Sequence, residues 1–144
     1  MENIKSILNK EVANFAVLYT KLHNYHWYVK GKLFYTLHSK LEELYDAVTG
    51  FYDDVAERLL MIGGRPAATL KEYLALATIQ EASGNETTED MIKTVLKDFE
   101  KVIGELAEGI KAANEAGDDV TADLLVGISK DLQKQAWMLR TVTE

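Results

Sequence analysis

The stretch that decides the fold runs from residue 34 to residue 66 and reads FYTLHSKLEELYDAVTGFYDDVAERLLMIGGRP. Its apolar side chains recur every three or four positions, which is the spacing of one face of an α-helix. This stripe consists of Leu37, Leu41, Leu44, Val48, Phe51, Val55, Leu59 and Ile62. The helix expected over 34–62 ends at Gly63-Gly64-Arg65-Pro66, because glycine and proline commonly stop helices.

Three further stretches show helical spacing. The first covers residues 4–29, where one row of apolar side chains seven positions apart contains Leu8, Phe15, Leu22 and Val29. In the second, apolar side chains recur at helical spacing over residues 92–110, and Thr87 or Thr88 caps the start of the expected helix. In the third, apolar side chains recur over residues 125–139. We therefore expect four long helices.

The lengths of the connections predict how these helices are arranged. The links after residue 29 and around Gly117 are short, whereas about 25 residues separate the helix ending near 62 from the next one. This long connection contains a short apolar segment near 70–79. A short, long, short order is typical of a ferritin-like bundle with one crossover. The sequence thus predicts an all-α, ferritin-like four-helix bundle, a single domain over 1–144, with a short extra helix in the crossover.

Composition excludes several kinds of function. The chain of 144 residues contains no cysteine, which rules out disulfides, thiolate zinc sites and cysteine nucleophiles. Its formal net charge of −7 disfavours binding to polyanions. No apolar run of about 18 residues could span a membrane, and no apolar signal core follows the N-terminus. We expect a cytoplasmic protein with no membrane partner.

Two pairs of side chains on the helix expected over 34–62 are candidates for metal binding. His38 and Glu42 lie four residues apart, and so do Asp53 and Glu57. At about 100° per residue all four share one face, roughly opposite the apolar stripe. His38 and Asp53 are fifteen residues apart, or about 22 Å along a helix, whereas metal–ligand bonds are about 2 Å long. One ion therefore cannot contact both pairs within one chain.

The symmetry of these pairs predicts a site shared by two subunits. Both pairs are centred on the midpoint between Ala47 and Val48, so two antiparallel copies place the His38 pair of one chain opposite the Asp53 pair of the other. Ala47 and Gly50 would allow close approach. Mixed histidine and carboxylate ligands suit Fe(II), with Zn(II) and Mn(II) as competitors. No Glu is followed three residues later by His, so the motif of di-iron sites inside a bundle is absent. From spacing alone, the alternative is a solvated helix face.

Several motifs also carry a family resemblance over nearly the whole chain. They are Asn24-Tyr25-His26-Trp27, Val29-Lys30-Gly31, Phe34-Tyr35-Thr36-Leu37-His38, Glu43-Leu44-Tyr45-Asp46, Asp53-Asp54-Val55-Ala56-Glu57-Arg58-Leu59, Ile62-Gly63-Gly64-Arg65-Pro66, Gly117-Asp118-Asp119-Val120-Thr121 and Trp137-Met138-Leu139. With these motifs the chain resembles the Dps-type mini-ferritins, named as DNA-binding proteins from starved cells.

The resemblance implies a function and a set of ligands. It implies a dodecameric shell around an iron store, with ferroxidase centres at twofold interfaces and hydrogen peroxide as the preferred oxidant. It also implies that His26 and His38 of one subunit, with Asp53 and Glu57 of its neighbour, bind iron in a one-iron or two-iron centre. Glu42 stands where the family usually has aspartate. Its longer arm could decide whether a second metal is bound directly or through water.

Other residues near the motif have competing interpretations. By helical phase His26 lies on the inward stripe, and the alternative to a ligand is a core histidine bonded to a backbone carbonyl. The resemblance places Trp27 near the iron, where it could take up oxidising equivalents, but apolar packing at a helix end is equally compatible. For His23 we expect a surface or interface position, with at most a supporting role.

The resemblance also assigns acidic residues to an iron-entry pore, here Asp118, Asp119 and Asp123. The alternative is helix capping by Asp118 and favourable charge in the first helical turn. Family members that bind DNA commonly use flexible termini rich in Lys and Arg. Here about three residues precede the first helix, the chain ends in the sequence of 140–144, and twelve copies would multiply the −7 charge. Direct DNA binding is therefore not expected.

Together with this resemblance, the sequence predicts a ferroxidase that oxidises Fe(II), preferably with hydrogen peroxide, stores the ferric product and limits oxidative damage. Two other functions stay open. One is a DNA-binding nucleoid protein whose role is protective rather than enzymatic. The other is a structural shell without catalysis.

Overall fold

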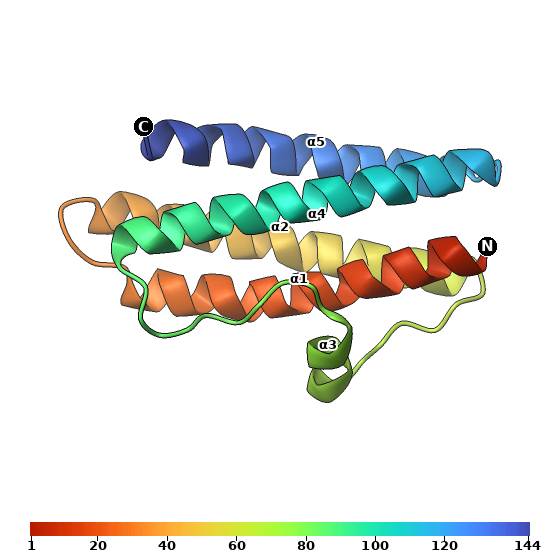
Figure 1. Ribbon diagram of the computed structural model, residues 1–144, viewed down its shortest axis with the longest axis horizontal. Coiled ribbons are helices and arrows are strands. Elements are labelled where there is room, and N and C mark those ends of the chain that lie inside the picture. The colour runs from red at the N-terminus through yellow and green to blue at the C-terminus, as the bar shows by residue number, and fades with distance from the viewer.

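The chain forms five α-helices and no strand in the computed structural model, which describes residues 1–144. The helices are α1 (Glu2–Tyr28), α2 (Phe34–Met61), α3 (Leu70–Leu76), α4 (Thr88–Glu115) and α5 (Asp119–Val142). Figure 1 shows the four long helices side by side, with α3 outside them and the two termini at opposite ends. The expected four-helix bundle with an extra helix in its crossover is confirmed. No helix combines the length with the apolar composition that a membrane span requires.

Local capping chemistry sets several of the helix boundaries. The hydroxyl of Thr87 accepts a hydrogen bond from the backbone N–H of Asp90, and the Asp90 carboxylate accepts one from the N–H of Thr87, so Thr87 caps α4. Gly63 and Gly117 follow α2 and α4 with φ angles of +88° and +73°, a region that favours glycine. Helix α1 begins at Glu2, two residues before the expected start, because its first turn is polar and does not appear in the apolar spacing.

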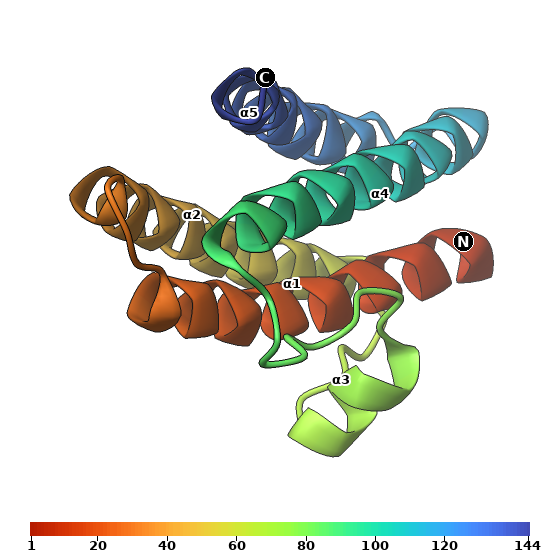
Figure 2. The same cartoon turned by 60° about the vertical axis from the view of Figure 1, so that its left-hand side comes forward.

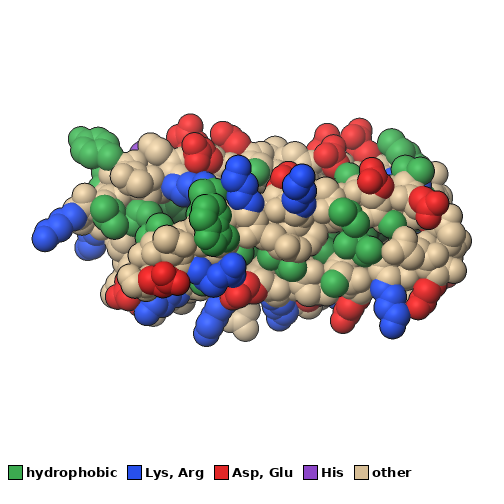
Figure 3. Space-filling model, turned by 90° about the horizontal axis from the view of Figure 1, so that it is seen from above, with side chains coloured by type: hydrophobic (Ala, Val, Ile, Leu, Met, Phe, Trp, Pro, Cys, Tyr) green, Lys and Arg blue, Asp and Glu red, His purple; other side chains and the backbone are tan.

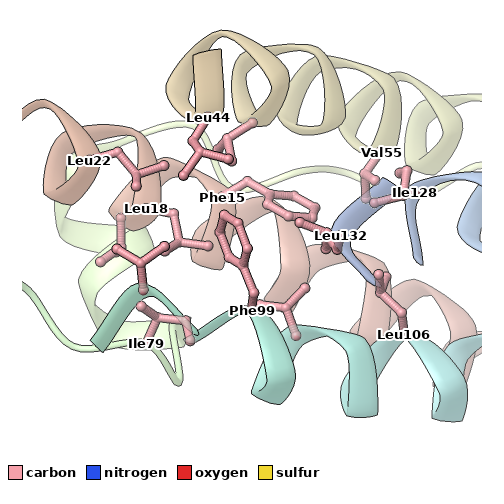
Figure 4. Close-up of a cluster of buried hydrophobic side chains, with 14 of the residues drawn as sticks. Phe15, Leu18, Leu22, Leu44, Val55, Ile79, Phe99, Leu106, Ile128 and Leu132 are labelled. Atoms are coloured by element: carbon pink, nitrogen blue, oxygen red, sulfur yellow. The ribbon is translucent and has the colours of Figure 1, made fainter. Parts of the chain in front are cut away.

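The core lies between the four long helices, where the apolar stripes meet. Six of the eight stripe residues of α2 are buried, and the other two, Phe51 and Ile62, pack against the core at its edge. Figure 4 shows core side chains of all four long helices gathered in one cluster, with Ile79 of the crossover at its edge. Phe15 of α1 and Phe99 of α4 are 0% exposed, and burying such a ring stabilises a protein by about 1.5–3 kcal/mol.

The crossover passes over the outer side of α1, against which α3 packs (Figure 2). Two buried polar side chains of α1 hold the segment that follows α3. The Asn14 Oδ1 atom accepts hydrogen bonds from the backbone N–H groups of Thr78 and Ile79, at 2.7 and 3.1 Å. The Lys21 Nζ atom donates to the carbonyl of Gln80 at 2.7 Å. These contacts connect the long loop to the bundle through specific hydrogen bonds.

Candidate metal centre

Two histidines bind each other's backbone at the end of α1 and the start of α2. The Nδ1 atom of His26 lies 2.7 Å from the carbonyl oxygen of His38, and the Nδ1 atom of His38 lies 2.7 Å from the carbonyl oxygen of His26. A carbonyl oxygen only accepts hydrogen bonds, so each Nδ1 carries a hydrogen and donates it. In a neutral ring the Nε2 atom then presents the lone pair that can bind a metal ion.

Neighbouring rings hold both imidazoles in place. His26 and His38 stack with their ring centroids 3.7 Å apart and their planes 12° apart. Phe34 stacks on His38 at 4.9 Å, and Tyr45 packs edge-on against His26 at 5.3 Å. Contacts of this kind, together with the Nδ1 hydrogen bonds, fix the orientation of metal-binding histidines in proteins.

Glu42 places a carboxylate beside this pair. Its Oε1 atom lies 3.9 Å from the Nε2 atom of His26, and its side chain is exposed whereas His26 is only 6% exposed. The carbonyl-bonded core interpretation of His26 is thus observed, and its role as a ligand stays a prediction. Its Nδ1 is bonded to a carbonyl, as in a core histidine, while its Nε2 faces an exposed carboxylate. We call His26, His38 and Glu42 the histidine half-site.

Three carboxylates gather further along α2. The ligand atoms of Asp53, Asp54 and Glu57 lie within 4.8 Å of one another, and all three residues are exposed. The four-residue spacing predicts Asp53 and Glu57 but omits Asp54. The three-residue spacing between Asp54 and Glu57 could have predicted it, because residues three apart are also neighbours on a helix. We call these three residues the carboxylate half-site.

One chain keeps the two half-sites apart. They lie on the continuous helix α2, about 22 Å from each other when measured from His38 to Asp53. Ala47 and Gly50 lie between them and are exposed, and a Cβ added to Gly50 would meet nothing within 4 Å. Figure 3 shows acidic side chains in two groups along one long edge of the molecule. The expected exposure of Glu42, Asp53 and Glu57 is thus observed, and within one chain the five predicted ligands form two separate clusters.

The third histidine and the neighbouring tryptophan lie outside both half-sites. His23 stacks on Tyr45 at 3.7 Å, and its Nδ1 donates to the carbonyl of Tyr19 at 2.7 Å. His23 therefore supports the ring that packs against His26. Trp27 is 65% exposed, with its ring 5.5 Å from that of His23. Packing within this chain therefore covers only part of the Trp27 side chain.

The acidic corner between α4 and α5 has one structural member and two exposed ones. Asp118 caps α5 by accepting a hydrogen bond from the N–H of Thr121 at 3.1 Å, and it pairs with Arg58 of α2 at 3.0 Å. Hydrogen bonds from Thr121 and the charge of Arg58 hold the pKa of Asp118 below its usual range. Asp119 and Asp123 are exposed. The capping interpretation therefore accounts for Asp118.

We expect Asp118→Ala to lower the free energy of unfolding by about 1–2 kcal/mol, because it removes the cap of α5 and the carboxylate that pairs with Arg58. Asp118→Asn should retain most of that stability, since an amide oxygen also caps a helix. Asp119→Ala should change it by no more than about 0.5 kcal/mol. Urea unfolding at one protomer concentration measures all three. Equal stability of Asp118→Ala and Asp119→Ala would contradict this assignment.

The fold places the chain among the ferritin-like proteins: residues 5–144 match the family model of the ferritin-like domain. The sequence is similar to DNA protection during starvation protein 2 of Bacillus anthracis, with 51% identity over 96% of this chain and 95% of that protein. The structure is similar to the crystal structure of Dps from Staphylococcus aureus, with a TM-score of 0.98, 40% identity, and coverage of 100% of this chain and 97% of that one. The chain therefore belongs to the Dps family.

A further relative bears on metal chemistry. Dps from Listeria innocua, in a structure soaked with cobalt, is 38% identical with a TM-score of 0.93, and the match covers 96% of this chain and 90% of that one. Cobalt was thus introduced into crystals of a protein of closely similar fold.

Proposed function

We propose that this chain is a ferroxidase that binds Fe(II) between subunits, oxidises it, preferably with hydrogen peroxide, and retains the ferric product inside a hollow dodecamer. The observation that carries the proposal is the reciprocal bonding of His26 and His38. It uses both Nδ1 atoms and leaves the Nε2 atom of each ring for a ligand, with that of His26 3.9 Å from the Glu42 carboxylate. Imidazole nitrogens with carboxylate oxygens suit Fe(II). The cobalt-soaked Listeria relative supports metal binding by this fold.

A second copy of the chain would complete each site. If two α2 helices pack antiparallel about a twofold axis, the histidine half-site of one subunit faces Asp53 and Glu57 of the partner subunit. The symmetric placement of the half-sites then gives two equivalent sites per dimer. Exposed small residues at Ala47 and Gly50 support close approach of the helices.

The ligand set suits the charge that develops during oxidation. Two Fe(II) ions supply the two electrons that reduce one hydrogen peroxide, which takes up two protons and leaves as two waters, so no hydroxyl radical is released. Carboxylates stabilise the additional positive charge of Fe(III). Glu42 would complete or bridge a second iron position. The exposed ring of Trp27 would take up stray oxidising equivalents.

The surface supports assembly beyond a dimer. Large apolar side chains are exposed at several places, including Tyr35 at 84%, Leu70 at 77% and Met61 at 71%. Green patches of this kind lie among the charged side chains in Figure 3. Extensive exposed apolar surface commonly marks protein–protein contacts. In the proposed shell, Asp119 and Asp123 would line an iron-entry pore.

Stopped-flow absorbance after mixing the apo protein with Fe(II) tests the activity. We expect ferric product to form faster with stoichiometric hydrogen peroxide than with dissolved oxygen, and to stay with the protein on gel filtration. Oxidation no faster than in protein-free buffer would contradict the proposal and favour a structural shell.

DNA protection is the second candidate, since the Bacillus anthracis relative carries that name. We propose that protection comes from removal of iron and peroxide rather than from DNA contact, because a net charge of −7 per chain opposes phosphate binding. A gel shift with linear DNA at low salt tests this. Free migration of the DNA supports the proposal, and its retention by the apo shell would overturn it.

A further inference from the structure

A buried carboxyl pair lies beneath the crossover, away from the candidate metal centre. Glu11 of α1 is 0% exposed, and it contacts Glu105 of α4, whose side chain is 13% exposed. Asn14 and Thr78 complete the cluster, and through Thr78 it connects to the segment that follows α3. The proposed ferroxidase chemistry uses none of these four residues.

The hydrogens available to this cluster are fewer than its acceptors. The Asn14 Nδ2 atom has two hydrogens but lies within 3.1 Å of three oxygens, on Glu11, Glu105 and Thr78. The Thr78 hydroxyl donates to Glu105 at 2.8 Å. The Oε2 atom of Glu11 is buried without any hydrogen-bond donor. One proton on Glu11 would supply the missing donor and allow this group to bond to the Glu105 carboxylate.

The charges around Glu11 favour that proton. Burial, followed by the hydrogen bond and the charge of Glu105, raises the pKa of Glu11 to about 9, against the opposing effects of Asn14 and Lys10. The Lys10 ammonium lies 3.9 Å from Glu105, so one positive charge faces two carboxyl groups. From the crossover, the neutral hydroxyl of Thr78 contacts the carboxyl pair. The backbone carbonyl of Thr78 accepts a hydrogen bond from Lys101 of α4 at 3.0 Å.

We propose that Glu11 and Glu105 share one proton and that this proton latches the crossover onto α1 and α4. With it, the pair carries a single negative charge, and Asn14 can direct its amide hydrogens at the carboxyl groups while its oxygen binds the backbone of Thr78 and Ile79. Without it, two negative charges meet in a buried site. Displacement of Thr78 and its neighbours admits water and relieves that repulsion, so the crossover opens as the proton leaves.

The direction of the pH effect follows from linkage. The pKa of Glu11 is higher in the closed state than its ordinary value of 4.5. The latch is therefore fully effective below that ordinary value and weakens as pH rises toward about 9. Opening at neutral pH releases one proton, so the opening equilibrium should increase about tenfold per pH unit.

Hydrogen exchange of the Thr78 and Ile79 amides tests the latch in the protein as purified. Between about pH 6 and pH 8, protection corrected for intrinsic exchange should fall about tenfold per pH unit. Glu11→Gln keeps the shape of the side chain but cannot ionise, so its protection should not depend on pH. Glu108→Gln, an exposed change on α4, should retain the slope of the parent. These two amides should also exchange faster than that of Leu132 in the core of α5, as local opening requires.

Three results would overturn the proposal. They are protection in the parent that does not vary with pH, a Glu11→Gln protein that retains the slope, or exchange of Thr78 only at the rate of Leu132. If Glu11→Gln fails to fold, infrared spectroscopy of the parent at pH 7 decides instead. A buried protonated carboxyl group gives a carbonyl band separate from those of carboxylates, and absence of that band would exclude the shared proton.

Discussion

Replacing Asp53 with Asn and Glu57 with Gln in the same chain is expected to slow the oxidation of Fe(II) by peroxide by at least about 100-fold. The change keeps the size of both side chains but removes the anionic oxygens that we propose as ligands of the ion. Loss of the contacts that merely orient ligands already costs about 10–100-fold in metal affinity or activity, so loss of two ligands should cost at least the upper end of that range. Stopped-flow absorbance at fixed Fe(II) and peroxide measures the rate.

The matched control for this variant is Glu43→Gln, which removes an exposed carboxylate from the same helix. Its rate should equal that of the parent. Asp54→Asn measures the share of the third member of the carboxylate half-site. Parental rates in the Asp53/Glu57 double variant would show that the iron binds elsewhere.

Replacing Phe99 with Ala is expected to lower the free energy of unfolding by about 3–5 kcal/mol, the usual cost of removing a buried aromatic ring and leaving a cavity. Phe99 is 0% exposed and lies in the centre of the core (Figure 4). Phe99→Leu fills much of the same space and should cost about 1.5 kcal/mol or less.

Guanidinium unfolding followed by circular dichroism measures this difference. All variants must be compared at one protomer concentration, because assembly adds to apparent stability. Lys97→Ala, an exposed change two residues away, should alter stability by no more than about 0.5 kcal/mol. A loss below about 1 kcal/mol for Phe99→Ala would mean that the core collapses around the missing ring.

Periodicity predicted the parts of the fold that depend on local sequence. The α2 stripe, the stop at Gly63 and the helix within the crossover all appear in the structure where the spacing placed them. The length of the helix also showed that His38 and Asp53 could not meet within one chain. These features can be predicted because the rise and turn of an α-helix are constant, so the spacing of residues along the sequence fixes their relative positions on the helix.

The features that sequence reasoning missed depend on contacts between distant segments. The mutual hydrogen bonds of His26 and His38 join two helices across a turn, so no spacing rule reveals them. The sequence gives Glu11 no role, because charged residues are usually exposed. Its burial depends on Glu105 and other residues that lie far along the chain. The position of Asp118 before a helix predicts its capping role. Its ion pair with Arg58 depends on the packing of α2 beside the start of α5, which the sequence does not show.

The central claim is that each iron site takes its histidines from one subunit and its carboxylates from another. The most direct test co-assembles two inactive proteins in equal amounts: one carries His26→Gln and His38→Gln, and the other carries Asp53→Asn and Glu57→Gln. Distinct affinity tags on the two chains verify that they mix. Half of the dimers are then mixed, and each mixed dimer has one intact site of two, so about a quarter of the parental rate should return. A mixed assembly as inactive as either protein alone would contradict the claim.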